Sequence, residues 1–251
     1  METLGIDIGG SGIKGAVVDL HTGSLMTDRH RLKTPKQSTP EALAESVAML
    51  TRHFSWQGVV GVGFPGIVCG GGLILSAANL SQAWIGHDAR AEFERVTALP
   101  FEITNDADAA GIAEMRFGAG ADVGGAVLLL TLGTGIGSAL FVDGKLIPNT
   151  ELGHLELNGE AAERYASVRV KAKNKLSWRA WARRLDQYLE RVHFYLSPEL
   201  IILGGGVSRY HEKFIPLLEV GCPVIPAQLR NTAGIVGAAL AASDLHDPLT
   251  N

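Results

Sequence analysis

The chain has 251 residues, which is enough for one large domain or for two lobes of ordinary size with a substantial core. Its net charge of -4 at pH 7 excludes a general affinity for nucleic acid or acidic membranes, so a site for a polyanion would have to be local. The two cysteines, Cys69 and Cys222, lack CxxC spacing and predict neither a disulfide framework nor a thiolate metal site, which fits a reducing cytoplasm.

Residues 4–19, LGIDIGGSGIKGAVVD, are predicted to form a β-hairpin with a glycine-rich tip. The tip carries Gly9, Gly10, Ser11, Gly12 and Lys14. Glycines let successive backbone amides approach phosphate oxygens as an anion nest. The stretch has no GxxxxGK[ST] pattern, and it leads into a strand where a dinucleotide-binding fingerprint requires a helix. We therefore expect a phosphate chain here, neutralised in part by a metal held around Asp7.

Helices and strands alternate in the following residues. Thr39 is expected to cap a helix that Pro40 begins, and its apolar positions repeat at helical spacing. Residues 58–64 and 101–104 are predicted strands, and Asn105 opens another helix. The uncharged residues 123–142 are long enough to span a bilayer, but GTGIG divides them into two short runs typical of a buried hairpin, so no membrane span is expected.

The second half continues with a loop that carries Glu151 and His154. A long helix is predicted from Ser177, with Trp178 and Trp181 as core anchors, because they share a face with leucines. Residues 200–208 are expected to form a strand, a glycine turn and the start of a helix, whose N-terminal amides would be a further anion site. A helix of small residues over 233–242 closes the chain.

The two halves of the chain share a weak repeat. A shift of 124 residues aligns IGGSGIKGAVVD with LGTGIGSALFVD, so both copies are predicted to form strand, glycine turn and strand. We expect two lobes, a small one over 1–104 plus 233–251 and a large one over 105–232, with the ligand in a cleft between them. The later glycine turns contain Gly133, Thr134, Gly135, Gly204, Gly205 and Gly206. Any one turn alone is about as consistent with a plain tight turn as with a phosphate site.

These motifs resemble those of a known family. Asp7-x-Gly-Gly-Ser-x-x-Lys14, LGTGIG and LGGGVS resemble the phosphate and nucleotide motifs of the actin-like sugar kinases, specifically the ROK (repressor, ORF, kinase) family. PNTELGHLEL, LSWRAWARRLDQYL, SPELIILGGGVS and RNTAGIVGAALAA resemble the polyphosphate glucokinases of that family, which phosphorylate glucose with polyphosphate, ATP or both. The resemblance implies an α/β, two-lobed, actin-like (ribonuclease H-like) fold, Mg²⁺ as cofactor and a homodimer.

A kinase that acts on a hydroxyl needs a carboxylate to accept its proton. Asp106, in TNDADA, is the candidate, although from local sequence a role at the helix N-terminus is about equally consistent. The resemblance assigns Asp106 as the base and Asn105 as its neighbour at the sugar. Asp108 is then interpreted as the residue that interacts with the helix dipole.

Sugar hydroxyls are both donors and acceptors, and Glu151 and His154 offer groups suited to them. A zinc site is not expected, because His154 has no HExxH pattern and no cysteine companions. The resemblance adds Asn79 and Glu163 as sugar ligands. Many ROK proteins have a cysteine-rich zinc motif just before this glutamate, but LNGEAAERYAS has no cysteine, as in polyphosphate glucokinases.

A basic stretch begins directly after Glu163. Residues 164–184 include eight lysines and arginines and no acidic residue. A solvated surface is the ordinary interpretation of such a run. The alternative is a track for polyphosphate, formed by Arg169, Lys171, Lys173 and Lys175, which would make affinity fall steeply with salt. Nucleic acid is not expected, because aromatic residues do not alternate with these charges.

The sequence thus predicts a glucokinase that transfers the terminal phosphoryl group of polyphosphate, ATP or both to the 6-hydroxyl of glucose. An ATP-dependent ROK kinase for mannose or another hexose is the nearest alternative, since LGGGVS adjoins the nucleotide in relatives. A sugar sensor without catalysis is an alternative of another class. The retained Asp106 and the three glycine turns argue against the sensor.

Overall fold

The computed structural model describes residues 1–244, and the chain divides into two compact units. Unit 1 contains Met1–Ala113 and the segment from Thr232 onward, and unit 2 contains Glu114–Asn231. The first division falls inside helix α3 (Asp106–Phe117), after the position expected from the sequence. The first half of α3 belongs to unit 1 because Ala109 packs against α7 (Ala233–Asp244) at Gly237.

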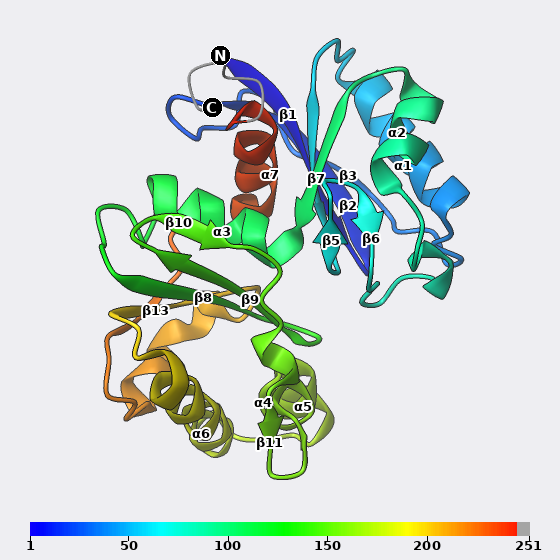
Figure 1. Ribbon diagram of the computed structural model, residues 1–251. Coiled ribbons are helices and arrows are strands. Elements are labelled where there is room, and N and C mark those ends of the chain that lie inside the picture. Colours follow the sequence, from blue (N-terminus) through cyan, green and yellow to red (C-terminus); the bar gives the residue numbers. More distant parts are fainter. Residues whose placement is uncertain (245–251) are drawn as a thin grey trace. The chain divides into compact units, whose positions relative to one another are not determined.

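Unit 1 is built on a five-stranded sheet (Figure 1). Its strands, in spatial order, are β3 (His30–Leu32), β2 (Gly12–Asp19), β1 (Glu2–Gly9), β4 (Val60–Phe64) and β7 (Phe101–Asn105). The predicted hairpin is confirmed, because β1 and β2 pair antiparallel. Strands β1, β4 and β7 run parallel to one another, so that their carboxyl ends lie at one edge of the sheet.

The two faces of this sheet carry different helices. Figure 1 shows α1 (Pro40–His53) and α2 (Ala89–Thr97) on one side and α7 on the other. Leu4 and Ile6 join the core cluster that includes Leu43 of α1. Gly5 of β1 and its neighbour Gly61 of β4 face α7. A side chain at either position would collide with the backbone of that helix. The predicted start of α1 is confirmed by its Thr39 cap.

Unit 2 repeats the same topology. Its sheet has the order β10 (Lys145–Ile147), β9 (Ile136–Val142), β8 (Ala126–Leu132), β13 (Leu200–Gly204) and β14 (Val224–Pro226). The outer pairs around β9 are antiparallel, and β8, β13 and β14 run parallel, as their counterparts do in unit 1. The repeat and the uncharged hairpin predicted from the sequence are confirmed. No helix within residues 1–244 is both long enough and apolar enough to cross a membrane.

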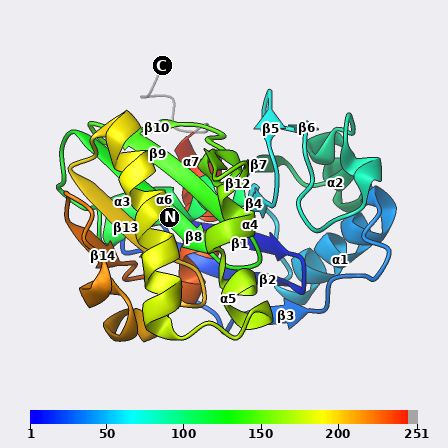
Figure 2. The same ribbon diagram turned by 90° about the horizontal axis from the view of Figure 1, so that it is seen from below.

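The core of unit 2 lies between its sheet and α6 (Trp178–Leu196), which Figures 1 and 2 show along one face. The Ser177 cap is confirmed, since its side chain accepts the amide of Ala180. Trp181 is fully buried and donates to the carbonyl of Ala166, as expected of a core anchor. Trp178 is only partly buried at the edge of this core.

Short elements complete the described chain. The remaining helices are α4 (Ala162–Ala166) and α5 (Val168–Lys173), and the short strands are β5 (Val68–Cys69), β6 (Leu73–Ile74), β11 (Glu156–Leu157) and β12 (Glu160–Ala161). The 3-10 helices are η1 (Gln82–Trp84), η2 (Leu152–His154), η3 (Ser208–Lys213), η4 (Ile215–Leu217) and η5 (Arg230–Thr232). Both cysteines are free.

Candidate active site

Two predicted residues of unit 1 lie at the carboxyl ends of its parallel strands. Asp7 of β1 is directly opposite Gly63 of β4. A Cβ at Gly63 would be 3.6 Å from the Cα of Asp106, an ordinary contact distance, so the start of α3 lies beside this end of β4. Asp7 and Asp106 therefore belong to the same edge of the sheet, where open α/β sheets bind their ligands.

Asn105 holds the start of α3 in place. Its Oδ1 accepts the amides of Ala107 at 2.8 Å and Asp108 at 3.0 Å, and its Nδ2 donates to the carbonyl of Gly66 at 3.0 Å. The residue is 6% exposed. These bonds make Asn105 a helix cap that positions Asp106, and contact between Asn105 and a sugar stays a prediction.

Burial distinguishes the two aspartates in the first turn of α3. Asp108 is 1% exposed, whereas Asp106 is partly exposed at the first position of α3. A general base must come within hydrogen-bond reach of the hydroxyl it deprotonates. Asp106 meets the access requirement for this role and Asp108 does not.

The first glycine turn is surrounded by polar groups. Lys14 Nζ lies 3.0 Å from Asp7 Oδ2, and both side chains are partly exposed. Thr34 Oγ1 donates to the carbonyl of Gly9 at 2.6 Å. Asn79 packs on Gly10, where a Cβ would lie 3.0 Å from that of Asn79. The structure thus brings the predicted sugar ligand Asn79 to the predicted phosphate turn.

Asp7 is the residue predicted to hold a metal at the first glycine turn. Among residues 1–244 no group of three or more acidic, histidine or cysteine side chains is placed to hold a metal. Mg²⁺ commonly uses only one or two carboxylates together with phosphates and water. Asp7 fits such a single carboxylate.

In unit 2, Glu151 and His154 form a pair across one turn of η2, with Nδ1 and Oε2 3.2 Å apart. Burial raises the pKa of Glu151, His154 lowers it in part, and the charge of Glu163 raises it further. Ser138 holds this loop by donating to the carbonyl of Thr150 and accepting the amide of Leu152. Sequence reasoning missed Ser138, because its partners are set by the fold.

Glu163 lies at the second glycine turn. Its Oε2 accepts the amide of Ile136 at 3.3 Å and lies directly against Gly135. The 3-10 helix η2 packs on the backbone of the same Ile136, so Glu163 and the loop that carries Glu151 and His154 both adjoin this turn. Carboxylates at one turn suit a ligand that donates hydroxyl hydrogens to them.

The second and third glycine turns meet at the carboxyl ends of β8 and β13. Gly205 packs on the backbone of Leu132 and has a φ of 80°, a conformation that favours glycine. The prediction of a regular helix after this turn is wrong. Residues Ser208–Lys213 form a short 3-10 segment that is kinked at Tyr210. A strong helix dipole requires aligned peptides over several turns. An anion at residues 204–206 would therefore be bound by the backbone amides of the turn itself.

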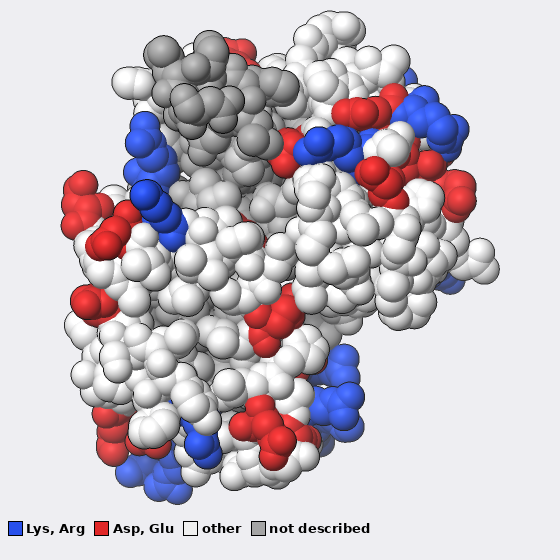
Figure 3. All heavy atoms as spheres, in the orientation of Figure 1, with Lys and Arg blue, Asp and Glu red and all other residues white. Residues whose placement is uncertain are grey.

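The basic stretch is exposed along α5, and Figure 3 shows Lys and Arg side chains gathered where Figure 1 draws this helix. Arg169, Lys173 and Lys175 are exposed. Lys171 differs, because its Nζ donates to the carbonyl of Leu176 at 3.1 Å and lies 4.1 Å from the ring centre of Trp178. The backbone of Arg169 donates to the carbonyl of Gly133, which attaches α5 to the second glycine turn.

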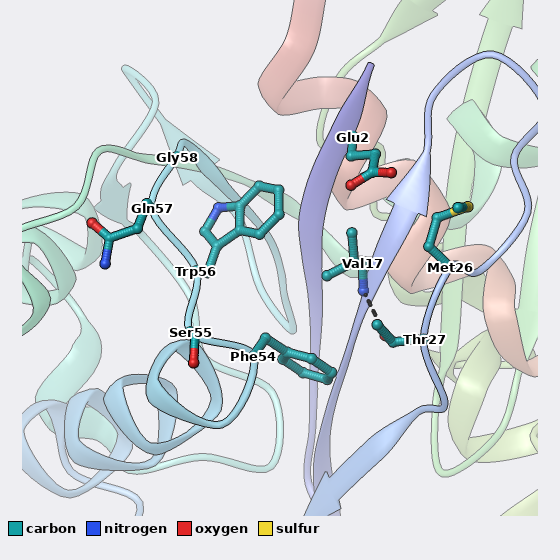
Figure 4. Close-up of a pocket in the computed structure, with 9 residues that line it drawn as sticks. All are labelled: Glu2, Val17, Met26, Thr27, Phe54, Ser55, Trp56, Gln57 and Gly58. Carbon is teal, nitrogen blue, oxygen red and sulfur yellow. Dashed lines mark hydrogen bonds between the residues drawn. The ribbon is translucent and has the colours of Figure 1, made fainter.

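A hollow of about 700 Å³ on unit 1 contains none of the predicted residues. Figure 4 shows Phe54 and Trp56 on one side of it and Val17 and Met26 on the other. The amide of Val17 donates to Thr27 Oγ1 at 3.1 Å. This hollow lies between the segment after α1 and the strands β1 and β2, away from the first glycine turn.

Comparison with known proteins places these features in context. A family model described as the ROK family matches residues 3–167. The chain is 50% identical over 238 residues to a polyphosphate glucokinase of Mycobacterium tuberculosis (strain CDC 1551 / Oshkosh), a match that covers 94% of this chain and 89% of that protein.

Two solved structures extend the comparison. The inorganic polyphosphate/ATP-glucomannokinase of Arthrobacter sp. strain KM matches with a TM-score of 0.94 and 47% identity over 98% of this chain and 99% of that chain. The ROK family glucokinase of Streptomyces griseus, solved with glucose and AMPPNP, matches with a TM-score of 0.83 and 25% identity over 97% of this chain and 99% of that chain. The structural matches confirm the α/β, actin-like sugar-kinase fold predicted from the sequence.

Proposed function

This chain belongs to the ROK family, and on that premise we propose that it is a glucokinase using polyphosphate, ATP or both. It transfers the terminal phosphoryl group of the donor to the 6-hydroxyl of glucose. The observation that carries this proposal is the sequence identity of 50% to a polyphosphate glucokinase over 94% of this chain, with 49% identity to another. The partly exposed Asp106, fixed by its Asn105 cap, supports a catalytic role.

In the proposed reaction Asp106 accepts the proton of the 6-hydroxyl. The hydroxyl oxygen then forms a bond to the terminal phosphorus, and the bond from that phosphorus to the leaving phosphate oxygen breaks. Such a transfer depends on positioning and on stabilising charge rather than on covalent help from the protein. The rigid cap beneath Asp106 supplies the positioning of the base.

Glucose is assigned to Asn79, Asn105, Glu151, His154 and Glu163, and the donor to the three glycine turns and Lys14. Mg²⁺ bound at Asp7 would offset the negative charge on the phosphates. Lys14 and the backbone amides of the turns stabilise the same charge from the protein side. We also expect a homodimer, as the resemblance implies, and a cytoplasmic location, which the cysteine pattern favours.

The direct test is the initial rate of glucose 6-phosphate formation with magnesium. Nucleotide-free polyphosphate and ATP are compared at matched phosphate concentrations. We expect faster turnover with polyphosphate. Activity with ATP alone would contradict the use of polyphosphate, and activity with neither donor would contradict the proposed enzyme. Mannose belongs in the same assay, because the similar Arthrobacter enzyme is a glucomannokinase.

The polyphosphate track gives a separate prediction. Lys173→Gln/Lys175→Gln removes two exposed charges while sparing Lys171, whose contacts with Leu176 and Trp178 are structural. We expect a higher KM for long polyphosphate, an unchanged KM for ATP and a weaker dependence of the polyphosphate KM on salt, because fewer phosphates are neutralised. Steady-state kinetics at several salt concentrations measure this.

The matched control removes two exposed charges elsewhere, at Arg52 and Lys145. It is expected to leave the KM for polyphosphate and its salt dependence unchanged. If the Lys173 and Lys175 variant behaves like this control, the basic stretch is ordinary surface.

A further inference from the structure

The register of unit 1 places three charged residues in one row across the sheet. Asp7 of β1 is directly opposite Lys14 of β2, and Lys14 is directly opposite Arg31 of β3. Residues directly opposite each other in neighbouring strands project from the same face. One carboxylate and two cations therefore lie side by side beneath the first glycine turn.

Arg31 reaches the tip of that turn. Its Nη2 donates to the carbonyl of Ser11 at 2.9 Å. A Cβ at Gly12 would lie 2.5 Å from Arg31 Nε and 2.9 Å from Cζ, so the guanidinium covers this glycine. The φ of Gly12 is not positive, so its backbone conformation does not require glycine. The guanidinium therefore lies directly over Gly12, where an added side chain would have to displace it.

Arg31 has no ion-pair partner among the residues that the structure describes. Lys14 is paired with Asp7, whereas no carboxylate in residues 1–244 lies within ion-pair distance of the Arg31 side chain. A guanidinium has five N–H donors in a fork that matches phosphate oxygens. The side chain is exposed, and its bond to Ser11 leaves donors for a ligand.

We propose that Arg31 is a donor-binding residue, which contacts the phosphoryl groups held at the turn of residues 9–12. The inference rests on the proposed function, in which this turn holds the donor. Because the phosphates next to the transferred group are common to polyphosphate and ATP, Arg31 serves both donors. In this it differs from Lys173 and Lys175, whose proposed role is confined to long polyphosphate.

The test compares Arg31→Gln and Arg31→Lys with the wild-type enzyme. We expect Arg31→Gln to raise the KM for both ATP and polyphosphate by about 10- to 100-fold, the loss typical of a hydrogen bond to a charged group. The KM for glucose is expected to stay unchanged, and Arg31→Lys should restore part of the donor affinity. Arg52→Gln, an exposed arginine of α1, is the charge-matched control.

A purely structural role for Arg31 gives a different result. If the residue only shapes the hairpin tip, Arg31→Gln would lower the melting temperature and alter glucose binding as well. Calorimetric titration of magnesium tripolyphosphate without glucose measures donor binding apart from turnover. Equal affinities of wild-type and Arg31→Gln protein for tripolyphosphate, or equal donor KM values, would overturn the proposal.

The contact between Gly12 and Arg31 offers a second test. Gly12→Ala is expected to displace the guanidinium and raise the donor KM in the wild-type background. In the Arg31→Gln background, Gly12→Ala should raise the donor KM by a smaller factor. A double-mutant cycle detects this coupling between the two residues. Fully additive effects would contradict the inference. If wild-type protein neither binds tripolyphosphate nor phosphorylates glucose, the proposed function itself fails, which is a distinct outcome.

Discussion

Asp106→Asn is expected to lower the turnover number by about 10²- to 10⁴-fold, the usual contribution of a positioned general base. Asparagine keeps the size of the side chain but cannot accept the proton of the 6-hydroxyl. The Asn105 cap bonds the amides of Ala107 and Asp108 rather than the changed side chain, so α3 should keep its start. Steady-state kinetics with saturating donor measure turnover, and calorimetry with glucose measures binding, which we expect to be largely retained.

The control for this variant is Asp122→Asn, at an exposed aspartate of positive φ that asparagine also tolerates. It removes the same charge and should leave turnover unchanged. Turnover of the Asp106 variant within a few-fold of wild type would remove Asp106 from the mechanism. Loss of folded protein would instead assign it a structural role.

Gly61→Ala is expected to destabilise unit 1 by about 1–3 kcal/mol or more, the cost of overpacking a tight core. A Cβ at Gly61 would collide with the backbone carbonyl of Ala238 in α7. That neighbour is main chain in a helix, so it cannot move aside as a flexible side chain can. Urea unfolding followed by circular dichroism measures the loss as a lower transition midpoint at an unchanged slope.

Gly63→Ala is the matched control two residues along the same strand. A Cβ there would meet Ala109 Cβ at 3.5 Å and Asp106 Cα at 3.6 Å, which are ordinary contacts. Its effect on the free energy of unfolding should be much smaller than that of Gly61→Ala. Equal midpoints for the two variants would show that α7 does not approach β4 as closely as described.

Local patterns predicted most elements of this fold. Thr39 before Pro40 and Ser177 before the long helix are caps that depend only on neighbouring residues. The alternation of apolar residues with glycines indicated both hairpins, and their similarity predicted the repeated sheet. The short 3-10 segment after Gly206 was not predicted, since propensity does not determine whether a turn continues as an α-helix.

The sequence by itself determined the elements, the glycine turns and the chemistry of the candidate residues, because each depends on side-chain type and short spacing. Only the tertiary structure decided that Asp108 is buried while Asp106 is accessible. It also decided that Lys171 packs on Trp178 and that Arg31 lies over Gly12. These are contacts between separate elements, and they depend on strand register and helix packing, which no local pattern specifies.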